Sequence, residues 1–337
     1  MAQPKVVISY RFTRADTTGI HCQEALQDII GKENVTFIDP RKFDTILEPP
    51  KSELYIAIDD DSVWRFPAEW GVEGQRAVWF IDTHTDFEKR MIRARNFDFI
   101  FTAQLRGARG LSESKRDDQS VKWLPLACNP KSHRYIPIEN RTSNWEKYAW
   151  SFVGHAPKDR WLPINRAVCL ELLAKHHQPF FYGNAYDDSM MQVYSSSTVT
   201  FNRAIVDDMN MRVFEAMASG RALITNDVEG LRRLFVPDKH LFVFSGQKSF
   251  EDEKKNLLSV MEFCQDPDHA DFVDAVSMTG METVHQYHTY EVRMREMLME
   301  TIGYDDGGVR MDYNRNIEQD PEYSPDSENL AQEEIRS

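Results

Sequence analysis

Residues 193–244 read VYSSSTVTFNRAIVDDMNMRVFEAMASGRALITNDVEGLRRLFVPDKHLFVF, and this stretch decides the predicted fold. Its pattern predicts a strand that ends near Phe201, a polar loop, a short helix, and a second strand over Ala222–Thr225. A loop containing Gly230, another helix and the strand Leu241–Phe244 follow. Two helices therefore begin just after strand ends, where parallel α/β sheets bind ligands and free backbone N–H groups hold anions.

The loop and helix also carry polar side chains at a useful spacing. Asp207 and Glu215 are eight residues apart, and Asn210 is placed to cap the helix. A carboxylate before a helix and another in its second turn can bind hydroxyls at the two ends of a long polar molecule. The phosphates of that molecule would lie over the helix start, within reach of Arg212. The alternative is an ordinary amphipathic helix with a solvated Glu215.

The run NMRVFEAMASGRALITNDVEGL, residues 210–231, resembles the donor-binding core of GT-B glycosyltransferases. It is most similar to the CgeB-like (spore maturation protein) branch, with the pattern R-x-F-E-A-x-A-x-G, a strand, and G-L-x-x-L-F. The resemblance implies that Glu215, Arg212, Asn210, Met211 and Gly230 contact a nucleotide-diphosphate sugar.

The chain departs from the family pattern at the start of this loop. Retaining members carry E-x7-E, and here Asp207 takes the first position, which leaves its role at the sugar open because Asp208 is adjacent. Met209 and Asn210 replace two glycines. The resemblance favours retention, but an inverting enzyme with a base in the first domain stays an alternative.

The rest of the chain predicts two Rossmann-like halves, since short apolar segments alternate with helical patterns. GT-B architecture places the active site between such halves. The predicted divisions are a first, acceptor-side domain over 1–142, a nucleotide-sugar-binding domain over 143–284, a crossover helix over 285–303, and a disordered acidic tail over 304–337. The other predicted strands are Val6–Tyr10, Val35–Ile38, Leu54–Ile58, Ala77–Ile81, Phe97–Thr102, Val121–Leu124, Ala149–Val153 and Pro179–Tyr182.

Several polar residues follow the predicted strands and are candidates for the cleft. His84 and Asp82 follow Ala77–Ile81, in a segment similar to the family's D-[ST]-H, and could act as general base or touch the sugar. Their alternative is a histidine that caps its own loop. Gly154, with Lys158 and Arg160 after it, follows the first strand of the second half, where the family places phosphate contacts.

Three further features leave alternatives open. Asp59–Asp61 follow a strand and could bind acceptor hydroxyls, or solvate a loop. The arginines and lysines between Arg90 and Arg116 could form a basic groove, or an ordinary solvated face. Gly19, in the first strand–helix loop, could let a ligand approach the backbone.

Composition and charge limit the classes of function. The four cysteines make no CxxC pair, and no residue cluster predicts a metal site or a bound cofactor. The N-terminus enters a strand with no signal-peptide pattern, so a cytoplasmic protein is expected. Net charge is −14, and residues 304–337 hold ten acids against three arginines, which gives −7 and predicts a disordered tail. The remaining −7 argues against a broad nucleic-acid surface.

We therefore expect a metal-independent glycosyltransferase that uses a UDP-, GDP- or dTDP-linked sugar. The expected reaction is retaining, and the sequence leaves the acceptor unidentified. The alternatives are an epimerase or phosphorylase on the same fold, a glycosyltransferase acting on modified DNA bases, and a non-catalytic nucleotide-sugar-binding module whose acidic tail recruits partners.

Overall fold

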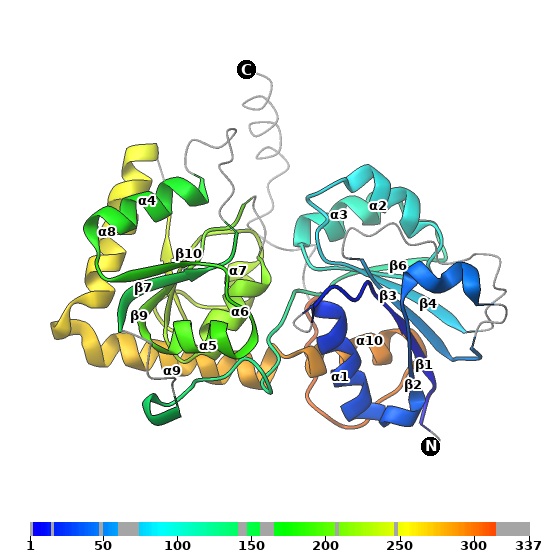
Figure 1. Cartoon of the computed structure of the whole chain (residues 1–337). Helices are drawn as coiled ribbons and strands as arrows, with labels where there is room; N and C mark the ends of the chain where they lie inside the picture. The colour runs from blue at the N-terminus through cyan, green and yellow to red at the C-terminus, as the bar shows by residue number, and fades with distance from the viewer. Residues whose placement is uncertain are drawn as a thin grey trace.

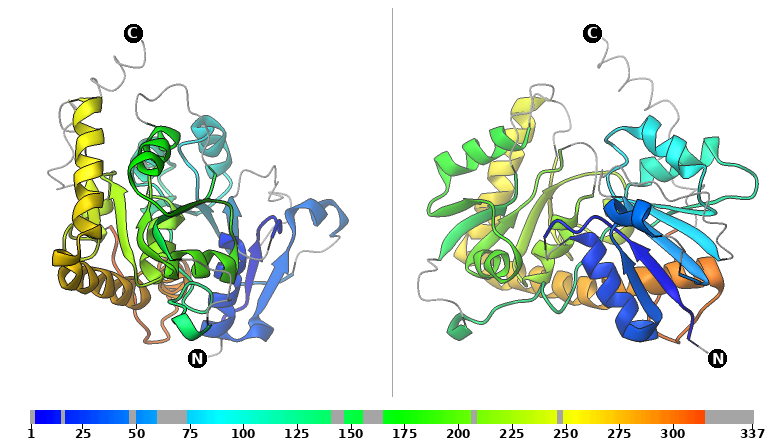
Figure 2. Two further views of the ribbon diagram at one scale, coloured as in Figure 1. Left: turned by 60° about the vertical axis from the view of Figure 1, so that its left-hand side comes forward. Right: turned by 45° about the vertical axis from the view of Figure 1, so that its right-hand side comes forward.

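The computed structural model describes residues 3–14, 17–46, 50–59, 74–140, 147–155, 165–205, 209–245 and 249–314. Two α/β domains lie beside each other, each built around its own parallel sheet (Figure 1). Figure 2 shows the same two lobes from other directions. Within the described ranges, no helix is both long and apolar enough to cross a membrane. The predicted domain boundary at residue 142 falls outside them.

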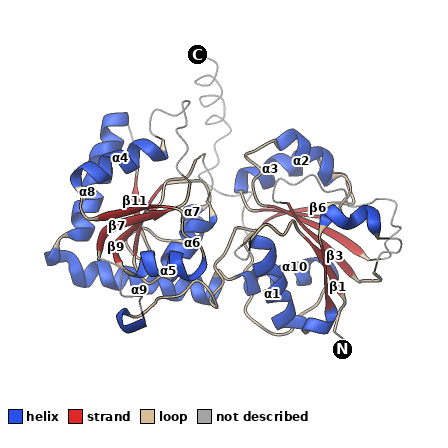
Figure 3. Cartoon of the chain, in the orientation of Figure 1, coloured by secondary structure: helices blue, strands red, loops and turns tan. Residues whose placement is uncertain are grey.

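The first domain contains a six-stranded sheet in the order β2-β1-β3-β4-β5-β6 (Figure 3). Val6 of β1 lies opposite Val35 on one side and Leu54 on the other, so the strand order reverses direction at β1. The central strands are apolar along their length because helices cover both faces. The strands are β1 (Val6–Ser9), β2 (Val35–Ile38), β3 (Leu54–Asp59), β4 (Gln75–Phe80), β5 (Phe99–Thr102) and β6 (Ser120–Trp123).

Two pairs of helices enclose this sheet. One face packs against α1 and α10 through residues such as Leu26 and Met294, and the other packs against α2 and α3 through Ala94 and Leu111 (Figure 1). The helices are α1 (Thr18–Ile30), α2 (Phe87–Ala94), α3 (Leu105–Ser114) and α10 (Tyr290–Ile302).

The second domain contains a five-stranded sheet in the order β11-β10-β9-β7-β8, which reverses direction at β7. Helices α4 and α8 pack on one face, while α5 and α6 pack on the other. The strands are β7 (Tyr148–Val153), β8 (Phe180–Gly183), β9 (Ser197–Phe201), β10 (Ala222–Asn226) and β11 (Phe242–Phe244). The helices are α4 (Arg166–His176), α5 (Asp187–Ser195), α6 (Met211–Ala218), α7 (Leu231–Leu234), α8 (Phe250–Gln265) and α9 (Ala270–Tyr287).

The predicted strands are confirmed, each within two residues at either end, but the predicted single helix over 285–303 is wrong. The chain breaks at His288 and Thr289. There the Cys128 N–H donates to the His288 carbonyl, and the Tyr290 N–H donates to the Cys128 carbonyl, both at 3.0 Å. Thr289 then caps α10 by accepting from the Val292 N–H. The first domain thus holds the backbone between α9 and α10, and α10 packs against α1.

The expectation of disorder from residue 304 onward is also wrong for residues 304–314, here called the C-terminal strap. Tyr313 is buried, and the Arg293 guanidinium donates to its hydroxyl. The Asn314 side chain accepts from the Trp123 N–H at 2.8 Å and donates to the Trp123 carbonyl at 3.1 Å. Trp123 lies on β6, whose outer edge has free backbone groups that bind such a partner. Residues 315–337 fall outside the described part of the chain.

We expect Tyr313→Ala to lower the free energy of unfolding by about 3 kcal/mol, because it removes a buried aromatic ring. Urea denaturation measures the change. Two truncations supply the control: ending the chain after Asn314 should keep the wild-type midpoint, and ending it after Gly303 should lower it at least as far as Tyr313→Ala. Equal stability of both truncations would show that the strap does not contribute.

A carboxylate beneath the strap gives the fold a specific pH dependence. Burial raises the pKa of Glu296 to about 7, and the charges of Glu300 and Asp312 add to the shift. The folded protein therefore keeps a proton that the unfolded chain has lost above its ordinary pKa of 4.5. The stabilising contribution is complete below that pKa and disappears as the pH rises through about 7.

We expect Glu296→Gln to match the wild type in stability near pH 4 and to exceed it near pH 8, because the amide stays neutral at both pH values. Denaturation curves at the two pH values test this. A stability difference that does not change with pH would contradict it.

Candidate functional site: the interdomain cleft at the start of α6

The second-domain side of the site lies where β7, β9 and α6 meet, at the point where the strand order reverses. Asn210 caps α6 as predicted, with its side-chain oxygen accepting from the Arg212 N–H at 3.2 Å. Asn202, which directly follows β9, is buried and donates to the Thr225 hydroxyl at 3.0 Å. Ligands of doubly wound sheets bind outside the carboxyl ends of strands at such a reversal, so this corner of the second domain is a candidate ligand site.

Arg212 connects the ends of two strands. Its guanidinium donates to the Val153 carbonyl at the end of β7 and to Asn202 Oδ1 at 3.0 Å. It also lies 4.6 Å from the centre of the Phe152 ring. These contacts fix the side chain of Arg212, the arginine predicted to bind phosphate. They hold its positive charge at the start of α6.

Gly154 is required by this arrangement. Its φ of +139° is a conformation that side chains rarely adopt, and a Cβ there would lie 2.1 Å from Arg212 Nη2. The glycine thus lets the arginine lie against the turn after β7. Lys158, Arg160 and Asp207, predicted to share this site, fall outside the described residues.

Glu215 points inward from the second turn of α6 and is 6% exposed, so the solvated alternative is wrong. Its Oε1 lies 3.7 Å from Nε2 of His133, a residue that follows β6 and is fully buried. Burial raises the pKa of the Tyr194 hydroxyl; the Arg212 charge opposes that shift and the Glu215 charge adds to it. Glu215 therefore lies among polar groups supplied by α5, α6 and the segment between the domains.

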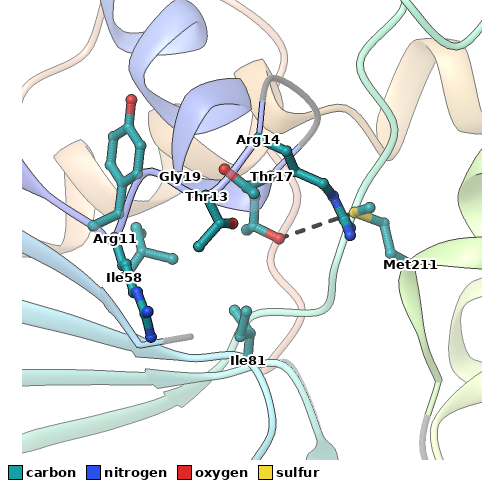
Figure 4. A pocket seen from close by; sticks show the side chains of 10 residues that line it. Arg11, Thr13, Arg14, Thr17, Gly19, Ile58, Ile81 and Met211 are labelled. Carbon is teal, nitrogen blue, oxygen red and sulfur yellow. Dashed lines mark hydrogen bonds between the residues drawn. The ribbon is translucent and has the colours of Figure 1, made fainter. Parts of the chain in front are cut away.

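A cavity of about 250 Å³ faces this corner from the first domain (Figure 4). It lies at the carboxyl ends of β1, β3 and β4, and Met211 at the start of α6 completes its wall. The Thr18 hydroxyl contacts Met211 Sδ at 3.9 Å across the domain boundary. The predicted Met211 site residue thus joins the two halves of the site. The lining residues are Tyr10, Arg11, Thr13, Arg14, Thr17, Thr18, Gly19, Ile58, Ile81 and Met211.

The polar wall of the cavity is cationic. Arg11 and Arg14 project from the loop between β1 and α1, and no carboxylate is among the described residues that line the cavity (Figure 4). Arg14 also lies 4.9 Å from the ring centre of Tyr186 in the second domain. Helix α1 begins beside them with no acidic residue in its first turn. The start of a helix adds positive potential, so the cavity favours an anionic group.

Other first-domain candidates lie further away. His84 and Asp82 follow β4 as predicted, but neither lines the cavity, whereas Ile81 does. His84 is exposed and Asp82 partly buried. Asp60 and Asp61 fall outside the described residues, as does the side chain of Asp59. The roles of these groups therefore stay predictions.

Two glycines serve packing. A Cβ on Gly19 would lie 2.1 Å from the Tyr10 ring, so this glycine makes room for the ring, and it also lines the cavity. Gly230 has a φ of +82°, and a Cβ there would lie 2.9 Å from the Trp123 ring of the first domain. It starts α7, which has four residues, and the anion contact expected there stays a prediction.

Three cations of the basic cluster between Arg90 and Arg116 are engaged within the protein. Arg90 is buried, Arg109 forms an ion pair with Glu229 across the domain boundary, and Arg116 pairs with Asp118 at 2.9 Å. Arg95, Arg106 and Lys115 are exposed, so both alternatives for the cluster, a basic groove and an ordinary solvated face, stay predictions.

Comparison with known proteins agrees with this geometry. A family model described as "Glycosyl transferase-like" matches residues 145–299, which include β7, α6 and the crossover to α10. No curated protein matches the chain.

Solved structures extend the similarity to both domains. Anabaena Alr3699/HepE in complex with UDP and glucose has a TM-score of 0.59 at 9% identity, over 89% of this chain and 99% of its own. OtsA, in its apo form, has a TM-score of 0.62 at 10% identity, over 90% and 100%. An α-glucosyltransferase in complex with UDP and a 13-mer DNA containing a HMU base has the same values. At such identities the similarity shows the fold, and this chain has the GT-B fold.

Four residues of the candidate site are not among those predicted from the sequence. Asn202, Arg11 and Arg14 each follow a predicted strand, so the rule that ligands bind at strand ends could have found them. His133 carried no such signal, since it lies in an irregular segment after β6 and reaches Glu215 only through the packing of the two domains.

Proposed function

We propose that this protein is a glycosyltransferase that transfers a sugar from a UDP-sugar to a small acceptor in the cleft between its domains. The observation that carries the proposal is the corner where Asn210, Arg212 and Glu215 meet, because it belongs to the segment that matches the glycosyl transferase-like family. The fold neighbours that hold UDP or UDP-glucose support uridine as the nucleoside of the donor. Membership of the CgeB-like branch and retention of anomeric configuration are part of the proposal.

The proposed chemistry follows from the charge that the reaction creates. Breaking the anomeric C–O bond leaves a negative UDP, which must be stabilised as it forms. The positive end of the α6 dipole and the fixed Arg212 guanidinium can meet the diphosphate. Glu215 would accept hydrogen bonds from ribose hydroxyls. Asp207, His84 and Asp82 are the predicted residues closest to the reacting sugar.

The cationic cavity suggests the class of acceptor. Arg11 has no hydrogen-bond or ion-pair partner among the described residues, and with Arg14 it would hold a phosphate or carboxylate on the acceptor. We favour a small anionic acceptor over DNA, because the chain carries a net charge of −14.

Thermal shift with UDP, GDP, dTDP and UDP-glucose tests the donor, since a ligand that binds the folded state raises the melting temperature. UDP release is then measured with mannose and with mannose 6-phosphate as acceptors. Stabilisation by UDP would support the proposed donor. Faster UDP release with mannose 6-phosphate than with mannose would support an anionic acceptor. Stabilisation by none of the nucleotides would contradict it.

UDP release should be unchanged in EDTA, because the α6 start and Arg212 supply the positive charge that the leaving diphosphate needs. Assays with and without EDTA, each repeated after adding manganese, measure this. Activity that disappears in EDTA and returns with manganese would show that a metal neutralises the diphosphate.

A further inference from the structure

His133 is held in one orientation by groups on both sides of it. Its Nδ1 accepts from the Asn129 N–H at 3.0 Å, and its carbonyl contacts His285 Nε2 of α9 at 3.0 Å. Asn129 is in turn fixed to α1, where its side-chain nitrogen donates to Glu24 at 2.8 Å. The His133 ring also contacts the His21 ring of α1 edge-on at 5.2 Å. The imidazole is therefore placed by the first domain and by α9.

These contacts determine which nitrogen carries the proton. Burial lowers the pKa of His133 to about 3, and the charges of His21 and His285 add to the shift, so the ring is neutral at ordinary pH. Nδ1 accepts a hydrogen bond and must be unprotonated. The proton of the neutral ring is then on Nε2.

The Nε2–H group faces the Glu215 carboxylate. Nε2 is buried and makes no hydrogen bond within the described residues, and Glu215 Oε1 lies 3.7 Å from it. Buried donors almost always have an acceptor. A movement of about 0.7 Å would bring this pair to hydrogen-bond length, and such bonds are often long before the ligand is bound.

We propose that His133 is a positioning residue that orients Glu215 for the donor by donating from Nε2. The inference rests on the proposed function, since Glu215 acts there on the ribose of the UDP-sugar. The proposal also gives the first domain a role in donor binding. Helix α1 and the segment after β6 hold His133, and His133 in turn orients the Glu215 carboxylate of α6. A donor bound to the second domain would therefore depend on contacts made by the first.

Two substitutions test the hydrogen bonds of the two ring nitrogens of His133 separately. The side chain of His133→Asn ends near Nδ1, so it keeps an acceptor for Asn129 but loses the donor to Glu215. The side chain of His133→Gln reaches the position of Nε2, so it keeps a donor to Glu215 but loses the acceptor. Calorimetry with UDP as the probe should show about tenfold weaker binding for His133→Asn, the loss expected for one charge-assisted hydrogen bond. His133→Gln should restore most of the affinity.

A double-mutant cycle with Glu215→Ala completes the test, because residues that act through one another are not additive. In the Glu215→Ala background, His133→Asn should cause no further loss of UDP affinity. The inference would be overturned if His133→Asn and His133→Gln lost equal UDP affinity and lost it in the Glu215→Ala background as well. His133 would then have a purely structural role. If His133→Asn does not fold, the cycle is built with His133→Gln, whose affinity should stay within about threefold of the wild type. A wild type that does not bind UDP would refute the proposed function instead.

Discussion

Glu215→Ala is expected to weaken UDP binding by about 10- to 100-fold, which corresponds to about 1.5–3 kcal/mol for the loss of a charge-assisted hydrogen bond. The residue is 6% exposed at the second turn of α6, and its carboxylate is directed by the polar groups around it. Calorimetry with UDP and with UDP-glucose should give the same loss, because the contact proposed for Glu215 is to the ribose, which both ligands contain.

Two variants control this result. Glu282→Ala removes an exposed carboxylate from α9, so it should leave UDP affinity unchanged. Glu215→Gln keeps the size of the side chain and one carbonyl acceptor, and should lose less affinity than alanine. Affinity that is unchanged in Glu215→Ala would remove this residue from the donor site, even if the protein binds UDP.

Arg212→Ala is expected to abolish measurable transfer and to lower stability by about 2–3 kcal/mol, because it removes charged hydrogen bonds to Val153 and Asn202. Its charge also leaves the start of α6, where the diphosphate is proposed to lie. Steady-state UDP release and urea denaturation measure the two effects separately.

Arg212→Lys separates the charge of this residue from its geometry. Lysine keeps a cation but cannot bridge two strand ends, because its ammonium lacks the planar fork of the guanidinium. We expect it to recover part of the activity and little of the stability. Lys255→Ala, on the exposed side of α8, is the neutral control. Full activity in Arg212→Ala would show that the diphosphate binds elsewhere.

The strands could be predicted because each is a short apolar run between polar loops, and burial on both faces requires that pattern. The grouping of Asn210, Arg212 and Glu215 could be predicted for a related reason, since they lie within six residues of one helix start. Local spacing and strand order were sufficient to bring these residues together.

Contacts between distant segments could not be predicted in this way. Arg11 and Met211 are 200 residues apart, and only domain packing brings both to one cavity. Composition correctly marks the acidic tail as poor in apolar residues, but it gives no sign that Tyr313 fills a site beside Trp123 and Arg293. The break at His288 likewise depends on Cys128, which lies 160 residues earlier.

The central claim is that a UDP-sugar binds between the domains with its diphosphate at the start of α6. A crystal structure of the protein with UDP tests it most directly. The account predicts phosphates within hydrogen-bond reach of the α6 N–H groups and Arg212, with the ribose hydroxyls at Glu215. UDP bound away from α6, or bound there with its ribose remote from Glu215, would contradict it.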